Sequence, residues 1–240
     1  MKGLVRLGVD HRPAALTPSD YEVRRDDGFQ GVVAESLSHL WGITVELVVI
    51  TPSDRVAALQ DGRVDALFVR TGIHDALSAK AETIDAGYET ALAPIMRSDT
   101  DIASWPGLRG RKVCIAQGNE AAHTIASRYG AQVEIKTAPA KALAAMRTGD
   151  CDAVIDDAEV VRRILSKNLD RWYKFSATLP SEDWQKYVFA TAEGDLDSKH
   201  LLQGVVREWR RQGQWTVWIW SWATDVDFEE YLEQDAPDCH

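Results

Sequence analysis

Charged side chains that follow short apolar runs are the residues of this chain best suited to chemistry. Asp10 follows the first apolar run, Arg70 follows Ala66–Val69, and Asp157 closes the run that starts at Ala153. A carboxylate in such a place can accept an ammonium group, and a guanidinium can bind a carboxylate through two parallel hydrogen bonds. We therefore expect these residues to recognise a charged small molecule.

Motifs for several other kinds of chemistry are missing. The six histidines are scattered, and the sequence holds no G-x-S-x-G elbow, no Walker or G-x-G-x-x-G loop and no calcium-loop spacing of acids. Cys114 and Cys151 lie in apolar strand-like segments, and Cys239 is the penultimate residue. We expect buried or terminal thiols without a function, no metal and no cofactor.

The acidic balance of the 240-residue chain restricts its partners. The formal net charge is -10, from 27 Lys and Arg against 37 Asp and Glu. A nucleic-acid partner or an anionic membrane would need a basic surface, so we expect neither. No apolar stretch approaches the roughly 18 to 20 residues of a membrane span, so we expect no transmembrane helix. Met1-Lys2-Gly3 runs directly into an apolar strand, and we expect these residues not to be a signal segment.

Short apolar runs alternate with helical patterns in two similar series. The first predicts strands over 4–9, 45–50 and 66–69 and helices over 32–41 and 55–60. The second follows Trp105-Pro106-Gly107 and predicts strands over 113–116, 133–135 and 153–155 and helices over 121–129 and 140–147. This alternation is typical of parallel sheets with right-handed crossovers.

Two extended segments flank the second series and indicate two lobes. We expect a discontinuous first lobe of residues 1–92 and 191–240, an inserted second lobe of 97–187, and hinge strands near 92–96 and 187–192. Five tryptophans between Trp209 and Trp222 should anchor the returning chain on the first lobe. The acidic stretch 225–238 should form a free end. Ligands of such proteins bind in the cleft at the carboxyl ends of the strands.

Six motifs, in this order, resemble the bacterial extracellular solute-binding proteins of family 3, which serve polar amino-acid ABC transporters. They are Leu7-Gly8-Val9-Asp10, Asp27-Gly28-Phe29, and the segments 58–66, 108–113, 142–157 and 212–222. The resemblance covers nearly the whole chain. It implies an α/β protein with the two-lobed type II periplasmic binding fold, in which two hinge strands join lobes made of a mainly parallel sheet flanked by helices.

Two Gly-x-x-Asp-Ala repeats within these motifs have a physical interpretation of their own. Gly62 and Gly149 fall where a helix must end in a left-handed residue, and Asp65 and Asp152 lead into buried strands. We therefore interpret these four residues as structural.

The resemblance also implies a ligand site, from which the sequence departs. The implied ligand-binding residues are Asp10, Arg70, Thr71, Gly72, Gly118, Asn119, Glu120, Asp157 and Tyr187. The family binds the ligand carboxylate with the Arg of a T-x-T-P-E-R stretch, but Leu77 stands at that position, preceded by His74-Asp75-Ala76. Asn119-Glu120 replace a hydroxyl pair, and a carboxylate there would repel a carboxylate ligand.

Several of these residues have a second interpretation. Asp157 either contacts the ligand or caps a helix over 158–165. Arg70 either replaces the missing guanidinium or pairs internally with Asp157 or Glu120. Tyr88 and Tyr187 either line the cleft or pack at the hinge, and Trp184 is the tryptophan placed to meet a ligand.

The resemblance implies a periplasmic or other extracytoplasmic solute-binding protein of an ABC-type transporter, without enzyme activity. We expect a monomer that binds a small polar, amine-bearing molecule and has an ABC permease as partner. An ordinary free α-amino acid is an unfavourable ligand without the Arg. The alternatives are a ligand-sensing receptor module, a cyclohexadienyl-dehydratase-like enzyme on the same fold, and a module that acts only through a protein partner.

Overall fold

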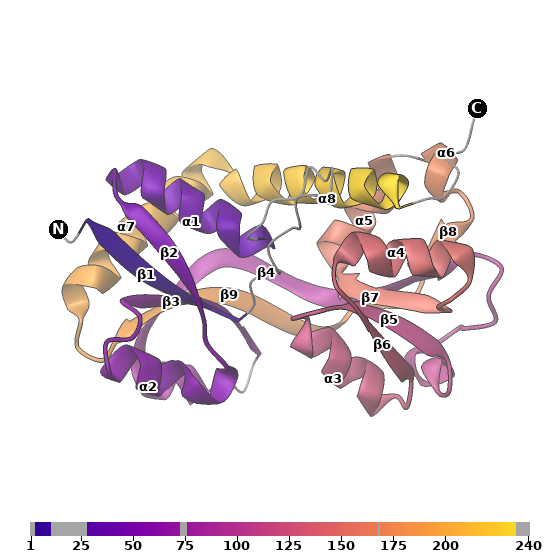
Figure 1. Ribbon diagram of the computed structural model, residues 1–240, viewed down its shortest axis with the longest axis horizontal. Helices are drawn as coiled ribbons and strands as arrows, with labels where there is room; N and C mark the ends of the chain where they lie inside the picture. The colour runs from indigo at the N-terminus through magenta and orange to yellow at the C-terminus, as the bar shows by residue number, and fades with distance from the viewer. Residues whose placement is uncertain (1–2, 11–27, 73–75, 168, 234–240) are drawn as a thin grey trace. The chain divides into compact units, whose positions relative to one another are not determined.

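The computed structural model describes residues 3–10, 28–72, 76–167 and 169–233 (Figure 1). The chain divides into two compact units, which are described separately. Of the described residues, unit 1 contains 3–10, 28–72, 76–89 and 184–218, and unit 2 contains 90–167, 169–183 and 219–233. This division differs from the expected lobes, because residues 219–233 fall in unit 2 and not with the rest of 191–240.

Unit 1 is built on a sheet with the strand order β2-β1-β3-β9. Strand β1 (Leu4–Val9) pairs in parallel with β2 (Thr44–Val49) and β3 (Ala66–Gly72), and β9 (Glu182–Ala192) pairs antiparallel with β3. Helices α1 (Gly28–Trp41) and α2 (Arg55–Gln60) lie on opposite faces of this sheet (Figure 1). Unit 1 also contains two short 3-10 turns, η1 (Pro52–Asp54) and η2 (Ala76–Ala79).

Unit 2 repeats the arrangement with the strand order β4-β7-β5-β6. Strands β5 (Lys112–Ala116), β6 (Gln132–Lys136) and β7 (Ala153–Asp157) are parallel, while β4 (Ala81–Arg97), which starts in unit 1, runs antiparallel to β7. Its other elements are α3 (Glu120–Arg128), α4 (Pro139–Thr148), α5 (Ala158–Lys167), α6 (Leu169–Trp172), β8 (Phe175–Ser176) and η3 (Trp105–Leu108). Helices α3 and α4 cover opposite faces of its sheet (Figure 1).

The two Gly-x-x-Asp-Ala repeats perform the same structural task in the two units. The Asp65 carboxylate accepts the backbone N–H of Arg6 in β1 at 2.8 Å, and that of Asp152 accepts the N–H of Lys112 in β5 at 2.8 Å. The glycines three positions earlier have φ of +65° and +89°, which favours glycine. The structural interpretation of these repeats is confirmed.

The tryptophans of the returning chain cluster where helices α7 (Leu196–Gln212) and α8 (Gln214–Leu232) meet. Trp209, Trp215 and Trp218 are buried, and their ring centroids lie 4.9 to 6.2 Å apart in edge-on pairs. All three belong to unit 1, so they anchor the chain there as expected. Trp220, by contrast, is 42% exposed and belongs to unit 2.

The expected free acidic end is wrong for its first half, because α8 continues to Leu232. Asp227 and Glu230 are buried and bind arginines of unit 2. Arg171 lies 3.0 Å from the Asp227 carboxylate and also bonds to Glu230, whose other oxygen is 3.2 Å from Arg147 Nε. These ion pairs hold the second half of α8 in unit 2. Residues 234–238 lie outside the described residues.

Candidate functional site

In unit 1, the predicted site residue Asp10 sits at the carboxyl end of β1. One carboxylate oxygen accepts a hydrogen bond from Arg55 Nη2 at 2.6 Å, and the other accepts the backbone N–H of Arg70 at 3.0 Å. Arg55 is buried and also donates to the Arg70 carbonyl at 3.1 Å. Asp10 therefore ties the ends of β1 and β3 to the start of α2.

Sequence reasoning missed Arg55. A basic residue at the first position of a helix is opposed by the helix dipole, which is the signal that could have drawn attention to it. The carboxylate of Asp10 offsets that charge.

Arg70 is held against an aromatic residue of the neighbouring strand. Arg70 and Tyr187 are direct partners in the register of β3 and β9. The Arg70 Nε donates to the Tyr187 hydroxyl at 2.7 Å, and its guanidinium carbon lies 5.3 Å from the ring centroid. Tyr187 is thus a partner of Arg70 within unit 1 that was not considered from the sequence.

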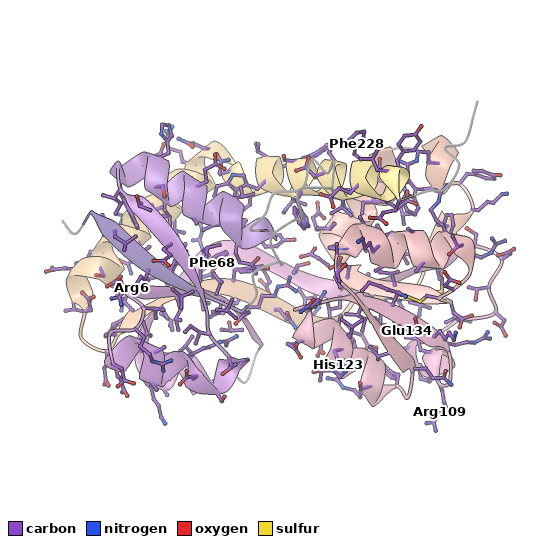
Figure 2. All side chains as sticks on the ribbon, viewed as in Figure 1. Arg6, Phe68, Arg109, His123, Glu134 and Phe228 are labelled. Carbon is purple, nitrogen blue, oxygen red and sulfur yellow. A yellow bond between two sulfur atoms is a disulfide. The ribbon has the colours of Figure 1, made fainter. Side chains whose placement is uncertain are left out.

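Tyr88 and Tyr187 belong to a buried aromatic cluster of unit 1. Their ring centroids lie 5.9 Å apart, and both rings stack near Trp215. Tyr187 also stacks on Phe68, labelled in Figure 2, at 4.9 Å. With exposed fractions of 7% and 2%, the two tyrosine rings serve as core, and this supports the second of the two interpretations considered for them.

In unit 2, the predicted residue Asp157 caps a helix. Its Oδ1 accepts the backbone N–H groups of Glu159 and Val160, at 2.9 and 3.3 Å, and the hydroxyl of Thr90 at 2.9 Å. Asp157 is buried, with 6% exposure. Capping of α5 is therefore present in the structure. Thr90, a buried hydroxyl in β4, carried no signal in the sequence.

Asn119 caps the neighbouring helix α3. Its side-chain oxygen accepts the N–H of Ala122 at 3.2 Å, while its Nδ2 donates to Asp156 at 3.2 Å. The same Asp156 oxygen accepts the backbone N–H of Asp157 at 2.8 Å. The ends of β5 and β7 are thus joined by hydrogen bonds, and Asp156 was not among the predicted site residues.

Gly118 and Glu120 flank this cap. Gly118 has a φ of +82°, which lets the chain turn from β5 into α3. Glu120 is the first residue of α3 and its side chain is exposed. The helix dipole stabilises a carboxylate at this place, so Glu120 presents a negative charge to solvent at the helix N-terminus.

Thr71 and Gly72 line a cavity of about 310 Å³ that lies wholly within unit 1. It lies beside the end of β3, the first half of β9 and the first half of β4. Its other lining residues are Leu77, Ser78, Thr83, Asp85, Glu89, Trp184, Gln185, Lys186 and Val188. The volume falls at the small end of ligand-binding pockets. Of the lining residues outside β3, the sequence had suggested only Trp184 for ligand contact.

Leu77, at the position that the resemblance gives to an arginine, is an apolar wall of this cavity. Its side chain is 3% exposed and packs with the core that includes Val69 and Val188. Residues 73–75 lie outside the described residues. They include His74 and Asp75, which align with the T-x-T-P-E-R stretch of the family.

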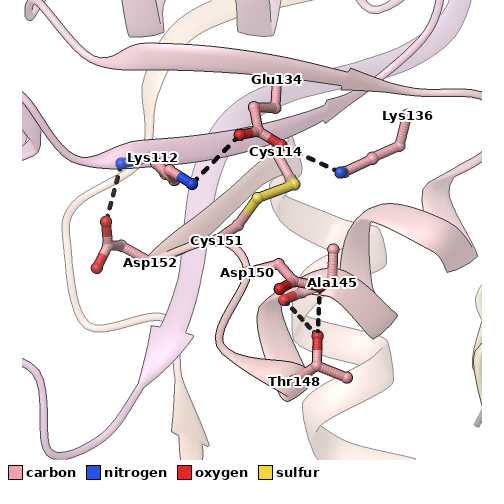
Figure 3. The surroundings of a disulfide bond; sticks show 9 residues. All are labelled: Lys112, Cys114, Glu134, Lys136, Ala145, Thr148, Asp150, Cys151 and Asp152. Carbon is pink, nitrogen blue, oxygen red and sulfur yellow. Dashed lines mark hydrogen bonds and ion pairs between the residues drawn. A yellow bond between two sulfur atoms is a disulfide. The ribbon is translucent and has the colours of Figure 1, made fainter.

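The expectation of free thiols at Cys114 and Cys151 is wrong, because the two form a disulfide (Figure 3). Thirty-seven positions separate them, and their Cα atoms lie 5.9 Å apart. Both are buried. The bond ties β5 to the short connection between α4 and β7, a pairing for which local sequence gave no signal.

Among the described residues there is one group that could hold a metal ion, and it includes both cysteines of the disulfide. This group consists of Cys114, Cys151 and Glu134, with donor atoms within 4.8 Å of one another. Glu134 is bound by Lys136 at 3.1 Å and lies 3.7 Å from Lys112 (Figure 3). The Lys136 hydrogen bond lowers the pKa of Glu134. Two of the three ligands are thus consumed by the sulfur–sulfur bond while it is intact.

The architecture defines the class of the molecule: two α/β units, each with a mainly parallel sheet and polar residues at the carboxyl ends of its strands. This is the two-lobed fold of periplasmic binding proteins, as predicted from the sequence. Within the described part of the chain, no helix is both long and apolar enough to cross a bilayer. No protein-family model and no curated protein sequence matches the chain.

Solved structures of binding proteins share this fold. A mutant of ArgBP from T. maritima is 19% identical, with a TM-score of 0.64 over 93% of this chain and 96% of that one. An ancestral cationic amino acid solute-binding protein is 20% identical, with a TM-score of 0.63 over 92% and 96%. The substrate-binding protein of an amino acid ABC transporter is 17% identical, with a TM-score of 0.60 over 91% and 98%. At these identities the likeness establishes the fold.

Proposed function

We propose that this chain is the solute-binding protein of an ABC-type transporter and that it binds a small polar, amine-bearing molecule. The observation that carries the proposal is the extent of the structural likeness. It spans 91 to 93% of this chain and 96 to 98% of ArgBP, of an ancestral cationic amino acid solute-binding protein and of the substrate-binding protein of an amino acid ABC transporter. The proposed partner is the membrane-bound permease, which the protein serves as a monomer.

The disulfide supports a location outside the cytoplasm. Disulfides persist in oxidising compartments such as the bacterial periplasm and are rare where thiols are kept reduced. The Cys114–Cys151 bond is buried and links strand β5 of unit 2 to the connection before β7. We therefore propose that the chain folds in the periplasm or an equivalent extracytoplasmic space.

The charge of the site residues supports a cationic solute. Leu77 supplies an apolar wall where the resemblance has an arginine, and Arg70 is bound to Tyr187. A ligand carboxylate without a guanidinium partner loses on the order of 2 to 5 kcal/mol of binding. Glu120 is exposed and negative at the start of α3, and Asp157 lies at the end of β7. An amine is the ligand group that these acids favour.

A ligand screen on the protein exported to the periplasm tests the proposal. Thermal shift, followed by isothermal titration calorimetry, would compare putrescine and agmatine with arginine, glutamine and glutamate. We expect the amines without a carboxylate to bind more tightly than the amino acids. Micromolar binding of common amino acids, with no response to the amines, would contradict the ligand class. No response to any polar solute would contradict the function.

A further inference from the structure

The cavity of unit 1 combines an exposed aromatic ring with two carboxylates. Trp184 is 55% exposed although it lines the cavity, which is unusual for a tryptophan of a folded protein. Asp85 and Glu89, from the first half of β4, are also exposed and line the same cavity. An indole face and a carboxylate are the two protein groups that attract an organic cation.

Strand alternation explains why these side chains share one face. In β4, Ile84, Ala86 and Tyr88 are buried, while the intervening odd-numbered residues are more exposed. In β9, the buried Tyr187 belongs to the aromatic cluster on one face, so that its neighbours Trp184, Lys186 and Val188 point to the other. The cavity is thus built mainly from one face of the two strands, with Gln185 of β9 as a further lining residue.

The two carboxylates of the cavity differ in their partners. Asp85 accepts the N–H of Gly87 at 2.7 Å and lies 3.4 Å from Arg210. Glu89 makes no ion pair or hydrogen bond with the other described residues. Its charge is therefore more fully available to a ligand than the charges of Asp10 and Asp157, which are bound to buried donors.

Building on the proposed function, we propose that this cavity is a cation subsite for the solute. A guanidinium or alkylammonium group would lie against the indole of Trp184, with Glu89 as its main counter-charge and Asp85 as a second. Leu77 and Val188 would contact the alkyl part of the same molecule. Lys186, which also lines the cavity, opposes a cation by like charge and so sets a limit on the affinity.

Two charge-removing variants with opposite expected effects test this subsite. Agmatine and 4-hydroxybutylurea, an uncharged analogue of similar shape, would be titrated by calorimetry into each purified protein. Glu89→Gln should weaken agmatine about fivefold, and Lys186→Gln should strengthen it about threefold, as expected for partly exposed charges. For each variant, the fold-change in affinity for the urea should be less than about half of the fold-change for agmatine.

The aromatic contact is tested by two substitutions at Trp184. Trp184→Ala should weaken agmatine about fivefold, while Trp184→Phe should retain part of the affinity because a phenyl ring still offers a π face. Glu193→Gln is the matched control, since it removes an exposed carboxylate of unit 1 that does not line the cavity. We expect it to leave agmatine binding unchanged.

The outcomes separate this subsite from the function on which it rests. If wild-type protein binds agmatine but Glu89→Gln and Lys186→Gln have no effect, or shift the affinity in the same direction, the subsite is refuted and the solute-binding function stands. If the wild-type protein binds none of the amines, the proposed ligand class and the subsite that rests on it both fall, whereas the solute-binding function falls only if no polar solute binds. An agmatine preference over its urea that disappears in Glu89→Gln and grows in Lys186→Gln establishes the subsite.

Discussion

Reduction of the Cys114–Cys151 disulfide should destabilise unit 2 by a calculable amount. The bond closes a loop of 37 residues, and the loss of loop-closure entropy from the unfolded chain corresponds to about 4 kcal/mol at 25 °C. Both cysteines are buried, so we expect the folded state to gain little flexibility on reduction. The effect should therefore arise chiefly in the unfolded state.

Urea unfolding with and without dithiothreitol measures this difference. Hydrogen exchange of peptides from β5 and β7 reports the urea midpoint of unit 2, and we expect this midpoint to fall markedly on reduction. The midpoint reported by peptides from β1 and β3, in unit 1, should change little. The double variant Cys114→Ala/Cys151→Ala is the control, because its midpoint should not respond to the reductant. Thiol titration of the denatured, unreduced wild-type protein should find one free thiol, that of Cys239.

Two results would refute the reasoning in different ways. Three free thiols in the unreduced protein would mean that the disulfide does not form. One free thiol, together with an unchanged midpoint after complete reduction, would mean that the cross-link does not limit the unfolded chain as the loop-entropy argument requires.

Three further predictions concern charged groups. Glu230→Gln should lower the unfolding free energy by about 3 kcal/mol, because it leaves two arginines facing a neutral amide. Glu233→Gln, one residue beyond the end of the same helix, should cost less than about 1 kcal/mol, and equal losses in urea titrations would contradict this. Asp157→Asn should retain helix capping, since Asn caps as well as Asp, but weaken amine binding; unchanged affinity in calorimetry would remove Asp157 from the site. The hydrogen bond from Lys199 lowers the pKa of Glu82 below its ordinary 4.5. The resulting stabilisation is present above about pH 4.5 and is lost as the pH falls through the lower folded-state pKa, so acid melts should show a steeper loss for wild type than for Glu82→Gln.

Regular periodicity made most of the elements predictable. The strand over 4–9 and the helix over 55–60 are confirmed at both ends, and the other predicted elements are confirmed with shifts of a few residues. The first half of β4 was missed because residues 81–89 form no apolar run. Their alternation of exposed and buried side chains becomes visible only when one face of the strand is known to be buried.

The sequence predicted where along the chain two of the candidate site residues lie, but not which side chains contact them. Asp10 and Asp157 do end their strands, but the sequence could not show that Arg55 binds the first or that Thr90 donates to the second. The partners lie 45 and 67 positions away. Pairings at such separations depend on the tertiary fold, for which local spacing holds no information.

The sequence by itself determined the alternation of strands and helices, the glycine positions that end helices and the acidic character of the protein. Each of these depends on local periodicity, backbone conformation or composition. Only the tertiary structure decided that two distant cysteines form a bond, that acids near the carboxyl end of the chain are buried in ion pairs, and that Trp184 lines a cavity with Glu89. Burial and partnership are set by residues brought together across the fold, and these change an acid from a solvated charge into a cap, an ion-pair partner or a ligand group.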